Sequence, residues 1–492
     1  MNPVIDPKQF EDHGQGFGQT AAQTVLDLNK ALTAGTASDP GSQSGGGALR
    51  VESLDSTLKI VSFMMKNIVF YNDIPKSKAY NTVEEYNLLS KYGGRGGFFI
   101  SEGGLPRTED SDYQRKVQYV KFMGSTREIS HPMLLVRPAH GNVVALETKN
   151  GAMWMLQRME EFLFSGNSTV MAQSFNGLRK QLEDGYADSK TAGDGKPDTS
   201  VEHILDLRDK VLTEGIFAEA SRVLLDNYMY PTHCYLNHVN HRDYNTQFFS
   251  KGRYGIPVSG SEDMGTGFDS RKVKTAGGTI QLRPNVFLRI DQTAPASADN
   301  ASAPTAPASV TVTVQAKTTT RGFKGSTTAI EAGTYAYEVT ALSRNGESAA
   351  TAGNASAVVA VVGTSDEVKL VIARGAVSGN DLTQGYRVYR TRLADGATGT
   401  KYLVAEIPSA GASTNYLDGN ENLPGLGVAY VGQLDETVLT LRELSPMLKF
   451  PLATIASSIR WMQLYYNTPI VFRPRGWVII KNIGRLNVPE LG

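Results

Sequence analysis

The apolar residues of the chain change their spacing several times, and each change predicts a different element. From Glu52 to Phe70 the apolar positions recur at helical spacing, and Pro75 ends the run. From Asn142 to Ser165 a second helical pattern has its stripe at Ala145, Ala152, Leu156, Met159 and Leu163. We expect two helices here, the second about 35 Å long for a rise of about 1.5 Å per residue.

A third helical pattern follows a polar loop. Thr199 and Glu202 have the spacing of a capping box, and the pattern runs in two pieces toward Tyr230. After it, the residues predict strands over Thr232–Tyr244 and Thr279–Ile290.

A glycine-rich stretch between the first two helices predicts an extended ribbon. Glycines at Gly93–Gly97 and Gly103–Gly104 flank a short apolar patch and imply bends. Lys116–Met123 and Thr126–Ser130 then resemble two strands joined at Gly124 and Ser125, and neither has a clean apolar face. Because a lone two-stranded ribbon is only marginally stable in water, we expect it to lie on a neighbouring chain.

The composition shifts abruptly at Thr293, where an Ala/Pro/Ser/Thr linker leads into short alternating strands. These strands, with a turn at Asn345–Gly346, predict a small β-sandwich. They are expected over Thr334–Leu342, Val368–Ala373, Gly385–Arg390, Lys401–Ile407 and Thr414–Asp418. Beyond the sandwich, two apolar strands close the chain, Trp461–Tyr466 and Pro469–Ile480, the second interrupted by Pro474. We interpret the sandwich as an insertion into a host domain, since its termini can lie close together.

Length and charge narrow the class of protein. The 492 residues exceed what one core usually serves, so two or three folded units are expected. The 49 basic and 49 acidic residues give a net charge of 0, which argues against a protein whose main task is to grip phosphate backbones. The single cysteine, Cys234, cannot form an intrachain disulfide, which fits assembly in a cytoplasm. The sequence predicts neither a signal peptide nor a membrane span.

One cluster of residues has the chemistry of a metal site. The segment PTHCYLNHVNHRDY holds His233, Cys234, His238, His241 and Asp243. Zinc would need its ligands to converge at about 2.0 to 2.3 Å, and this spacing matches no zinc module. A strand would place His233 and His241 on one face, and Cys234 with His238 on the other. Core or interface packing is the favoured interpretation, with a metal site as the alternative.

Two loops invite a ligand hypothesis. GGRGG at Gly93–Gly97 could cradle an anion, but it lacks the phosphate-loop pattern and follows no strand, so a loop hinge is favoured. Asp418, Asn420 and Asn422 imitate the start of a calcium loop, but Leu423 stands where that loop needs glycine. We interpret this segment as a terminal turn of the sandwich, with calcium binding as a minor alternative.

Paired carboxylates offer the remaining candidates for catalysis. Glu160 with Glu161, or Glu84 with Glu85, could be an acid and a base, but neighbours on a helix point about 100° apart and usually face water. No nucleophile elbow or HExxH motif is present. We therefore predict that the chain is no enzyme, with no catalytic, cofactor-binding or metal-ligating residues and no cofactor.

Two parts of the chain resemble known families. Ser309–Gly425, with TYAYEVTALSRNGES, GYRVYR, KYLVAEI and TNYLD, resembles the fibronectin type III and Ig-like modules often inserted in phage structural proteins. Residues 50–290 and 428–492 resemble tailed-bacteriophage major capsid proteins of the Johnson, or Hong Kong 97-like, fold. The second resemblance rests on an order of parts: a flexible arm, a Gly-flanked loop with a ribbon (Gly93–Pro132), a long spine helix, a mixed α/β region, and closing strands ending in RPRGWVIIKNIG.

The resemblance implies an α+β capsid fold with an inserted all-β sandwich. Its parts are an N-terminal arm (1–50), the first part of the peripheral domain (51–91), the extended loop (92–135), the spine helix and peripheral domain (136–200), the axial domain and return strands (201–292), the inserted fibronectin/Ig-like sandwich (293–427) and the closing strands (428–492). In that family the arm and the loop reach over adjacent subunits.

The implied function is self-assembly into hexamers and pentamers of an icosahedral head that contains double-stranded DNA. The virion capsid would assemble in the host cytoplasm, and the sandwich would project outward for stabilisation or host-surface contact. Some relatives form Lys–Asn cross-links, and Lys116 and Lys121 lie in the ribbon, but no motif fixes a cross-link and none is predicted. Portal, scaffolding and decoration proteins stay open as further partners, and no membrane partner is expected.

Other classes of protein stay open at this point. A shell protein of an encapsulated nanocompartment resembles the same fold, although an exposed module argues mildly against it. A secreted carbohydrate-active enzyme or adhesin with a fibronectin module is the alternative from a different class, and the missing signal peptide counts against it. A tail or baseplate protein would instead form rings or tubes.

Overall fold

The structure is a computed structural model that describes residues 62–93, 99–136, 142–188, 203–249, 271–319, 322–323, 333–353, 358–361, 366–376, 383–392, 399–453 and 456–486. The chain divides into two compact units. Met1–Ile60 with Arg137–Val143 form the first, of which only Asn142 and Val143 are described. The second contains every other described residue. The predicted arm, the capping box at Thr199 and Glu202, and most of GGRGG lie outside the described residues.

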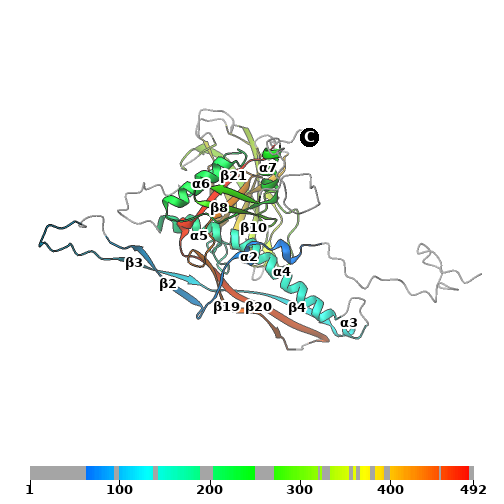
Figure 1. Ribbon diagram of the computed structural model, residues 1–492. Helices are drawn as coiled ribbons and strands as arrows, with labels where there is room; N and C mark the ends of the chain where they lie inside the picture. Colours follow the sequence, from blue (N-terminus) through cyan, green and yellow to red (C-terminus); the bar gives the residue numbers. More distant parts are fainter. Residues whose placement is uncertain are drawn as a thin grey trace, which may run out of the picture. The chain divides into compact units, whose positions relative to one another are not determined.

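The described elements alternate between helices and strands in the first half of the chain and are almost all strands in the second (Figure 1). The helices are α2 (Phe70–Asp73), α3 (His131–Leu135), α4 (Val143–Ser165), α5 (Leu178–Asp188), α6 (Glu214–Asp226) and α7 (His238–Phe249), with 3-10 turns η3 (Met65–Asn67) and η5 (Pro474–Gly476). The strands are β1 (Lys76–Lys78), β2 (Val83–Lys91), β3 (Asp112–Tyr119), β4 (Lys121–Ser130), β5 (Ile204–Asp206), β6 (His233–Asn237), β7 (Lys272–Thr275), β8 (Gly278–Asn285), β9 (Ser309–Ala316), β10 (Gly333–Ser343), β11 (Gly346–Glu347), β12 (Thr351–Ala352), β13 (Val358–Val361), β14 (Asp366–Ala373), β15 (Gly385–Thr391), β16 (Lys401–Pro408), β17 (Ser413–Asp418), β18 (Gly427–Gly432), β19 (Leu439–Pro451), β20 (Ser458–Val471) and β21 (Trp477–Ile483).

A mixed six-stranded sheet holds the largest apolar core. Its order is β5-β21-β18-β6-β8-β7, with helices α6 and α7 packed on it. β21 reads WVIIKNI and is buried at nearly every position, which is typical of a strand covered on both faces. The core cluster joins Trp477 of this strand to Tyr235 of β6, Phe164 of α4 and Phe217 of α6. We call this sheet with its helices the sheet core.

A second sheet, of order β1-β19-β20-β4, carries the long helix α4 on one face (Figure 1). The Gln463 side chain of β20 donates to the Thr148 carbonyl of α4 at 2.6 Å. Gly151 allows this close approach, because a Cβ there would lie 2.1 Å from Gln463 Oε1. The predicted spine helix is confirmed in its bounds, and Leu156, Met159 and Leu163 of its predicted stripe are buried, whereas Ala145 is exposed.

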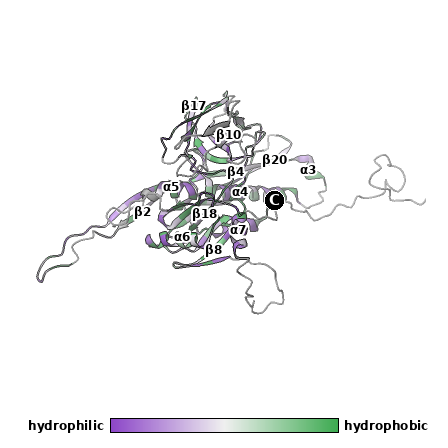
Figure 2. Ribbon diagram, turned by 90° about the horizontal axis from the view of Figure 1, so that it is seen from above, coloured by the Kyte–Doolittle hydropathy of each residue, from purple (hydrophilic) through white to green (hydrophobic). Residues whose placement is uncertain are grey.

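Two further sheets enclose one apolar cluster of their own. β10 lies between β11 and β15, β16 follows β15, and β12 and β13 also pair with β10. The other sheet has the order β17-β14-β9. Val339, Val388 and Tyr337 from the first sheet pack with Leu370 and Val312 from the second. All five strands predicted in this region are present, and β10 and β17 lie together in Figure 2. We call this pair of sheets the sandwich.

The helix predicted over Glu52–Phe70 is wrong in its described part. Residues 62–69 contain only the turn η3, and α2 begins where the predicted helix ends. The apolar spacing is explained instead by burial, since Ile68 and Phe70 enter two different clusters. The backbone amides of residues 69–71 bind a side chain, Glu160, rather than the carbonyls of a preceding turn.

The hairpin predicted around Gly124 is also wrong. β4 runs through Gly124 without a turn and pairs with β20, whereas β3 pairs with β2. A Cβ at Gly124 would lie 2.7 Å from Leu464 Cδ2 and 2.9 Å from the Gln463 carbonyl oxygen. This glycine therefore marks a close contact between strands rather than a turn.

Short strands and helices alternate where longer elements were predicted. Ile204–Asp206, expected to be helical, forms β5 and pairs in parallel with β21. The strand predicted over Thr232–Tyr244 ends at Asn237, and α7 follows. Asn237 Oδ1 accepts the Val239 amide at 2.8 Å, as a helix N-cap does. The strand predicted over Thr279–Ile290 is confirmed as the shorter β8.

The closing strands differ from the prediction at one proline and agree at the other. β20 passes through Pro469 unbroken, and its partner there, Leu441, uses its own amide to bond the Pro75 carbonyl at 2.8 Å. The missing amide of Pro469 therefore breaks no pairing with Leu441. Pro474 interrupts the strands as predicted, because η5 separates β20 from β21.

Candidate interaction surfaces

The ribbon formed by β2, β3 and the loop between them exposes apolar side chains along its length. β2 and β3 pair only with each other among the described strands. Phe99 is 91% exposed and Leu105 is 94% exposed. The other large apolar residues exposed in or beside the ribbon are Tyr80, Leu89, Tyr92, Ile100, Tyr113, Val117 and Tyr119. A ribbon with so much uncovered apolar surface has the properties of a segment that binds another surface.

The base of the ribbon is fixed by contacts within the chain. The Tyr86 ring meets the Phe472 ring edge to face, with centroids 4.9 Å apart. Glu84 accepts hydrogen bonds from two backbone amides of the turn before β2. Glu85 pairs across the ribbon with Arg115 at 2.8 Å. The described contacts of both glutamates hold the base of the ribbon together.

An apolar stripe crosses the face of the second sheet that is turned away from α4. Strand register places Phe122 opposite Tyr466, and Leu464 opposite Leu448. Phe122 is 61% exposed, Leu448 38% and Phe450 41%, and the Phe122 and Tyr466 ring centroids are 5.0 Å apart. This stripe was not predicted from the sequence. The available signal was that β20 carries large apolar residues on both of its faces, a pattern typical of a strand covered twice.

Glu160 of α4 is a buried carboxylate that joins distant segments. Its Oε1 accepts hydrogen bonds from the amides of Val69 at 3.2 Å and Phe70 at 2.7 Å, and from Asn285 Nδ2 at 2.6 Å. Its Oε2 accepts the Tyr71 amide at 2.8 Å. Glu160 is 0% exposed, and burial raises its pKa while the hydrogen bonds oppose that rise. The expectation that Glu160 faces water is wrong, because it supplies acceptors for the free amides at the start of α2.

The histidine-rich segment does not form the strand from which its faces were predicted. β6 carries His233 and Cys234, and α7 carries His238, His241 and Asp243. Cys234 is fully buried, which raises the pKa of its thiol. Asp243 is 1% exposed and accepts the Leu486 amide at 3.1 Å. Within the part of the chain that the structure describes, no group of three or more His, Cys, Asp or Glu side chains could hold a metal ion.

The segment that imitates a calcium loop binds an arginine instead. Arg390 is fully buried, and it donates to Asp418 Oδ2 at 2.5 Å and to Asn420 Oδ1 at 2.6 Å. Tyr337 also donates to Asp418, at 2.9 Å. The guanidinium lies over the Phe323 ring, 5.0 Å from its centroid. Asp418 Oδ2 and Asn420 Oδ1 are thus occupied by side chains of the sandwich itself.

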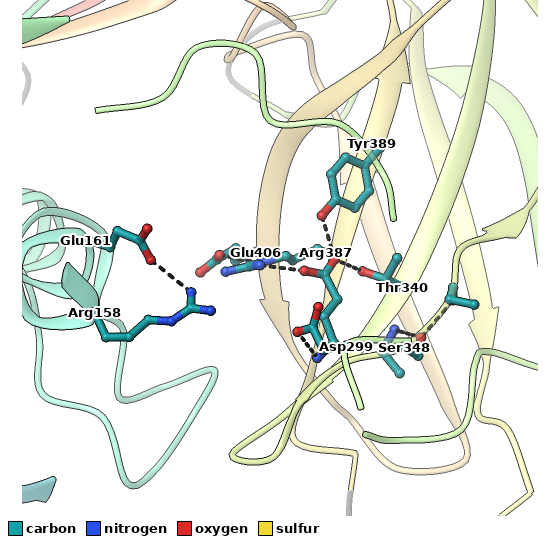
Figure 3. A network of polar contacts seen from close by, with 11 residues as sticks. Arg158, Glu161, Asp299, Thr340, Ser348, Arg387, Tyr389 and Glu406 are labelled. Carbon is teal, nitrogen blue, oxygen red and sulfur yellow. Dashed lines mark hydrogen bonds and ion pairs between the residues drawn. The ribbon is translucent and has the colours of Figure 1, made fainter. Parts of the chain in front are cut away.

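A polar network stabilises the other face of the sandwich (Figure 3). Glu347 accepts hydrogen bonds from Thr340 Oγ1 at 2.5 Å, Tyr389 Oη at 2.5 Å and Arg387 Nη1 at 2.6 Å. Arg387 also pairs with Glu406 at 2.7 Å. A buried carboxylate with a cation and two hydroxyl donors is fully satisfied, so the network has the properties of a structural element.

The remaining candidates also have local partners. Glu161 pairs with Arg158 at 3.0 Å along α4 (Figure 3). Lys121 donates to the Ala172 carbonyl at 2.6 Å, and Lys116 lies on β3. The expectation that GGRGG follows no strand is wrong, because β2 ends at Lys91, and Gly94 to Gly97 lie outside the described residues. None of the helices among the described residues is both long enough and apolar enough to cross a bilayer.

Comparison with known proteins places the chain beside phage capsid proteins. No protein-family model matches it. A protein of Enterococcus phage phiEF24C that is named "Putative major capsid protein" is 26% identical over 469 residues, which cover 93% of this chain and 94% of that protein. The major capsid proteins of Staphylococcus phages S25-3 and K are 24% identical over 476 residues, covering 94% of this chain and 96% of each relative. The similarity therefore extends into residues 293–427 and is not confined to the rest of the chain.

Solved capsid structures also align with the chain. The capsid of a native GTA particle aligns with a TM-score of 0.43 and 8% identity, covering 90% of this chain and 99% of that one. The capsid of cyanophage P-SCSP1u gives 0.43 and 9%, covering 89% and 94%. An encapsulin complex of Synechococcus elongatus PCC 7942 gives 0.38 and 9%, covering 87% and 92%. At these TM-scores the likeness carries no argument about this chain.

The resemblance drawn from the order of parts is confirmed at the level of the class. The chain is mixed α+β and strand-rich, and its sequence is similar to phage major capsid proteins along nearly its whole length. The relatives are named for a structural role, and nothing in them indicates a catalytic activity. The fibronectin or Ig-like identity of the sandwich and the division into capsid domains stay predictions.

Proposed function

We propose that this chain is the major capsid protein of a tailed-phage head, and that it assembles through hexamers and pentamers into an icosahedral shell around double-stranded DNA. The observation that carries the proposal is the similarity to phage major capsid proteins over 93% of the chain and 94% of the relative. The uncovered surfaces of the molecule are then explained by assembly rather than by catalysis.

In this proposal the ribbon of one copy lies on a neighbouring copy. Phe99 and Leu105 are each more than nine-tenths exposed in the single chain, and covering a large apolar side chain contributes about 1.5 to 3 kcal/mol. Each contact is small on the scale of a whole subunit. Because every copy both gives and receives a ribbon, the contacts add up over the closed shell.

The sandwich is proposed to be an inserted fibronectin or Ig-like domain that projects outward. Its apolar cluster takes its described members from residues 310–388, so it has a core of its own. An outward module can reinforce the capsomer or contact the host surface. The net charge of 0 suits a wall that contains DNA without gripping it.

Purified chain, sized by sedimentation and then imaged by cryo-electron microscopy, tests the proposal directly. Closed icosahedral shells with one protrusion per subunit are the expected result. If the chain stays monomeric or forms only small oligomers, even when a scaffolding protein from the same phage is supplied, the capsid proposal is wrong. Closed shells that enclose a cargo enzyme instead of DNA in the native particle would identify a nanocompartment.

A further inference from the structure

The segment by which the chain enters the sandwich packs against it rather than hanging free. Thr293 forms a β-bridge with Tyr402 of β16. Asp299 and Glu347 bond each other twice, through the Asp299 amide to the Glu347 carbonyl at 3.0 Å and the Glu347 amide to Asp299 Oδ2 at 2.9 Å. The Ala/Pro/Ser/Thr linker predicted here is therefore part of the sandwich. On the exit side, a Cβ at Gly425 would lie 3.2 Å from the Tyr402 ring, so entry and exit meet at one residue.

Three consecutive residues of the exit loop, Asp418–Leu423, are held by the sheet core and by α5, which shares its apolar cluster. Arg208, beside β5, donates to the Asn420 carbonyl at 2.7 Å. Asn482 of β21 donates from Nδ2 to the Glu421 carbonyl at 2.9 Å. Arg179 of α5 donates to Asn422 Oδ1 at 3.3 Å.

A fourth bond from Asn482 completes the set. Its Oδ1 accepts the Leu423 amide at 2.8 Å, and its Nδ2 also donates to Asp206 Oδ1 of β5 at 2.7 Å. Asn482 is 3% exposed and has φ of 56°, a left-handed conformation that asparagine tolerates better than most residues. Asn420 has the same left-handed conformation, with φ of 57°. Both asparagines thus fit the unusual backbone and the hydrogen bonds at once.

The same loop is tied into the interior of the sandwich. Asn420 Oδ1 accepts from Arg390, which also pairs with Asp418, and all three residues are at most 1% exposed. A movement of the loop would therefore disturb a buried ion pair, whose rupture leaves a buried charge uncompensated. The sandwich and the sheet core belong to one compact unit of the chain, which agrees with these contacts.

We propose that this clasp, made by Asp418–Leu423 with Arg179, Arg208 and Asn482, fixes the orientation of the sandwich on the sheet core. The projections of the assembled shell are then rigid rather than tethered. The statement about projections rests on the proposed capsid function, but the clasp can be tested on the unassembled chain.

The test compares a double variant, Arg179→Ala with Arg208→Ala, with the natural chain by amide hydrogen exchange. Neither arginine bonds the Leu423 amide, so faster exchange at Leu423 reports release of the whole loop rather than loss of its acceptor. We expect exchange there to accelerate about tenfold or more, as a local opening does. Amides of β14, which pairs with β9 and β17 inside the sandwich, should keep their protection.

Two further measurements complete the experiment. Arg222→Ala is the matched control, because this half-exposed arginine forms ion pairs with Glu219 and Asp226 of its own helix, α6. In assembled shells of the double variant, the density of the sandwich should blur while the shell stays sharp. Unchanged exchange at Leu423 with sharp sandwich density would overturn the clasp. Loss of β14 protection would overturn it too, because the contacts would then support folding rather than orientation. If the natural chain forms no shells, that result counts against the capsid proposal, and the exchange result still tests the clasp.

Discussion

At the scale of single residues, the buried carboxylate of Glu160 binds parts of the chain that lie 89 to 125 positions away in sequence. It faces four donors, three of them backbone amides of residues 69–71 and one the Asn285 side chain. Charge and shape therefore both matter here. A side chain with one acceptor and one amino group can satisfy only part of this set.

We expect Glu160→Gln to lower the free energy of unfolding by about 1 to 3 kcal/mol at neutral pH, since its amino group would face backbone donors. Chemical denaturation followed by circular dichroism measures the change. The control is Glu161→Gln on the same helix, where the ion pair with Arg158 is partly exposed. The free energy of unfolding of Glu161→Gln should fall by well under half of the loss expected for Glu160→Gln. Equal losses in the two variants would contradict the role given to Glu160.

The raised pKa of Glu160 predicts that the free energy of unfolding depends on pH. Burial raises the pKa of Glu160, so the folded state holds the proton more tightly than the unfolded state. The contribution of this carboxyl is therefore fully present below its unfolded pKa and declines as pH rises through its folded pKa. Relative to Glu160→Gln, the natural chain should lose stability as pH rises above the ordinary carboxyl value of 4.5. Unfolding curves of both proteins across that range would show a constant difference if Glu160 were exposed.

In the sequence, Glu160 is one of two adjacent carboxylates, and this local pattern does not distinguish it from Glu161. No residue near Glu160 in the chain indicates the amides of Val69 to Tyr71, which lie at the end of the segment predicted to be helical and just beyond it. The turn that begins at Asp418 gives a second example, because its partner, Arg390, lies in another strand. Such long-range partners depend on the fold and leave no local signal in the sequence.

At the scale of elements, local periodicity predicts single helices and strands but does not predict which strands pair. The spine helix and the strands of the sandwich were found from spacing alone, because each pattern is complete within its own segment. The predicted ribbon joins the wrong strands. β3 pairs with β2, which precedes it by about twenty residues across a loop. Gly124, taken for a turn, is required by a side chain of β20 more than three hundred positions away.

The contact between α4 and its sheet offers a test at this scale. Gly151→Ala would raise helix propensity by about 1 kcal/mol, but the new Cβ would lie 2.1 Å from Gln463 Oε1. Because the Gln463 side chain is fixed by its bond to Thr148, we expect a net loss of about 1 to 2 kcal/mol of unfolding free energy. Asn150→Ala, one position away on the exposed face, should leave stability unchanged or slightly raised. A stabilised Gly151→Ala protein would show that the helix is not packed so closely.

The ribbon yields a prediction about assembly rather than folding. Phe99→Asp with Leu105→Asp changes two side chains that are almost fully exposed, so the melting temperature of the single chain should hardly move. Shell formation should fall at least tenfold in sedimentation, because two charges would have to be buried on the neighbouring copy. Tyr228→Asp is the control, since Tyr228 is 80% exposed and lies outside the ribbon. Shells that form normally from the double variant would remove the ribbon from the assembly mechanism.

At the scale of the whole molecule, the sandwich and the sheet core have separate apolar clusters. Among the described residues, the cluster of the sheet core takes members before position 283 and after position 428, and the cluster of the sandwich lies between. The chain enters and leaves the sandwich beside Tyr402. This arrangement is what an insertion requires, because both ends can be joined without stretching the host.

We therefore expect a chain in which residues 294–424 are replaced by a short Gly/Ser linker to fold and still form shells. The sheet core keeps all of its buried apolar members, but Arg208 and Asn482 lose their partners on the exit loop. The melting temperature should consequently fall by a few degrees while the transition stays cooperative. Cryo-electron microscopy should show shells of unchanged diameter that lack the protrusions. An unfolded or aggregated deletion chain would mean that the sandwich is integral to the capsid core and not an insertion. A matched Arg179→Ala, Arg208→Ala chain separates the effect of losing the clasp bonds from the effect of losing the sandwich, because it removes the clasp bonds and keeps the sandwich.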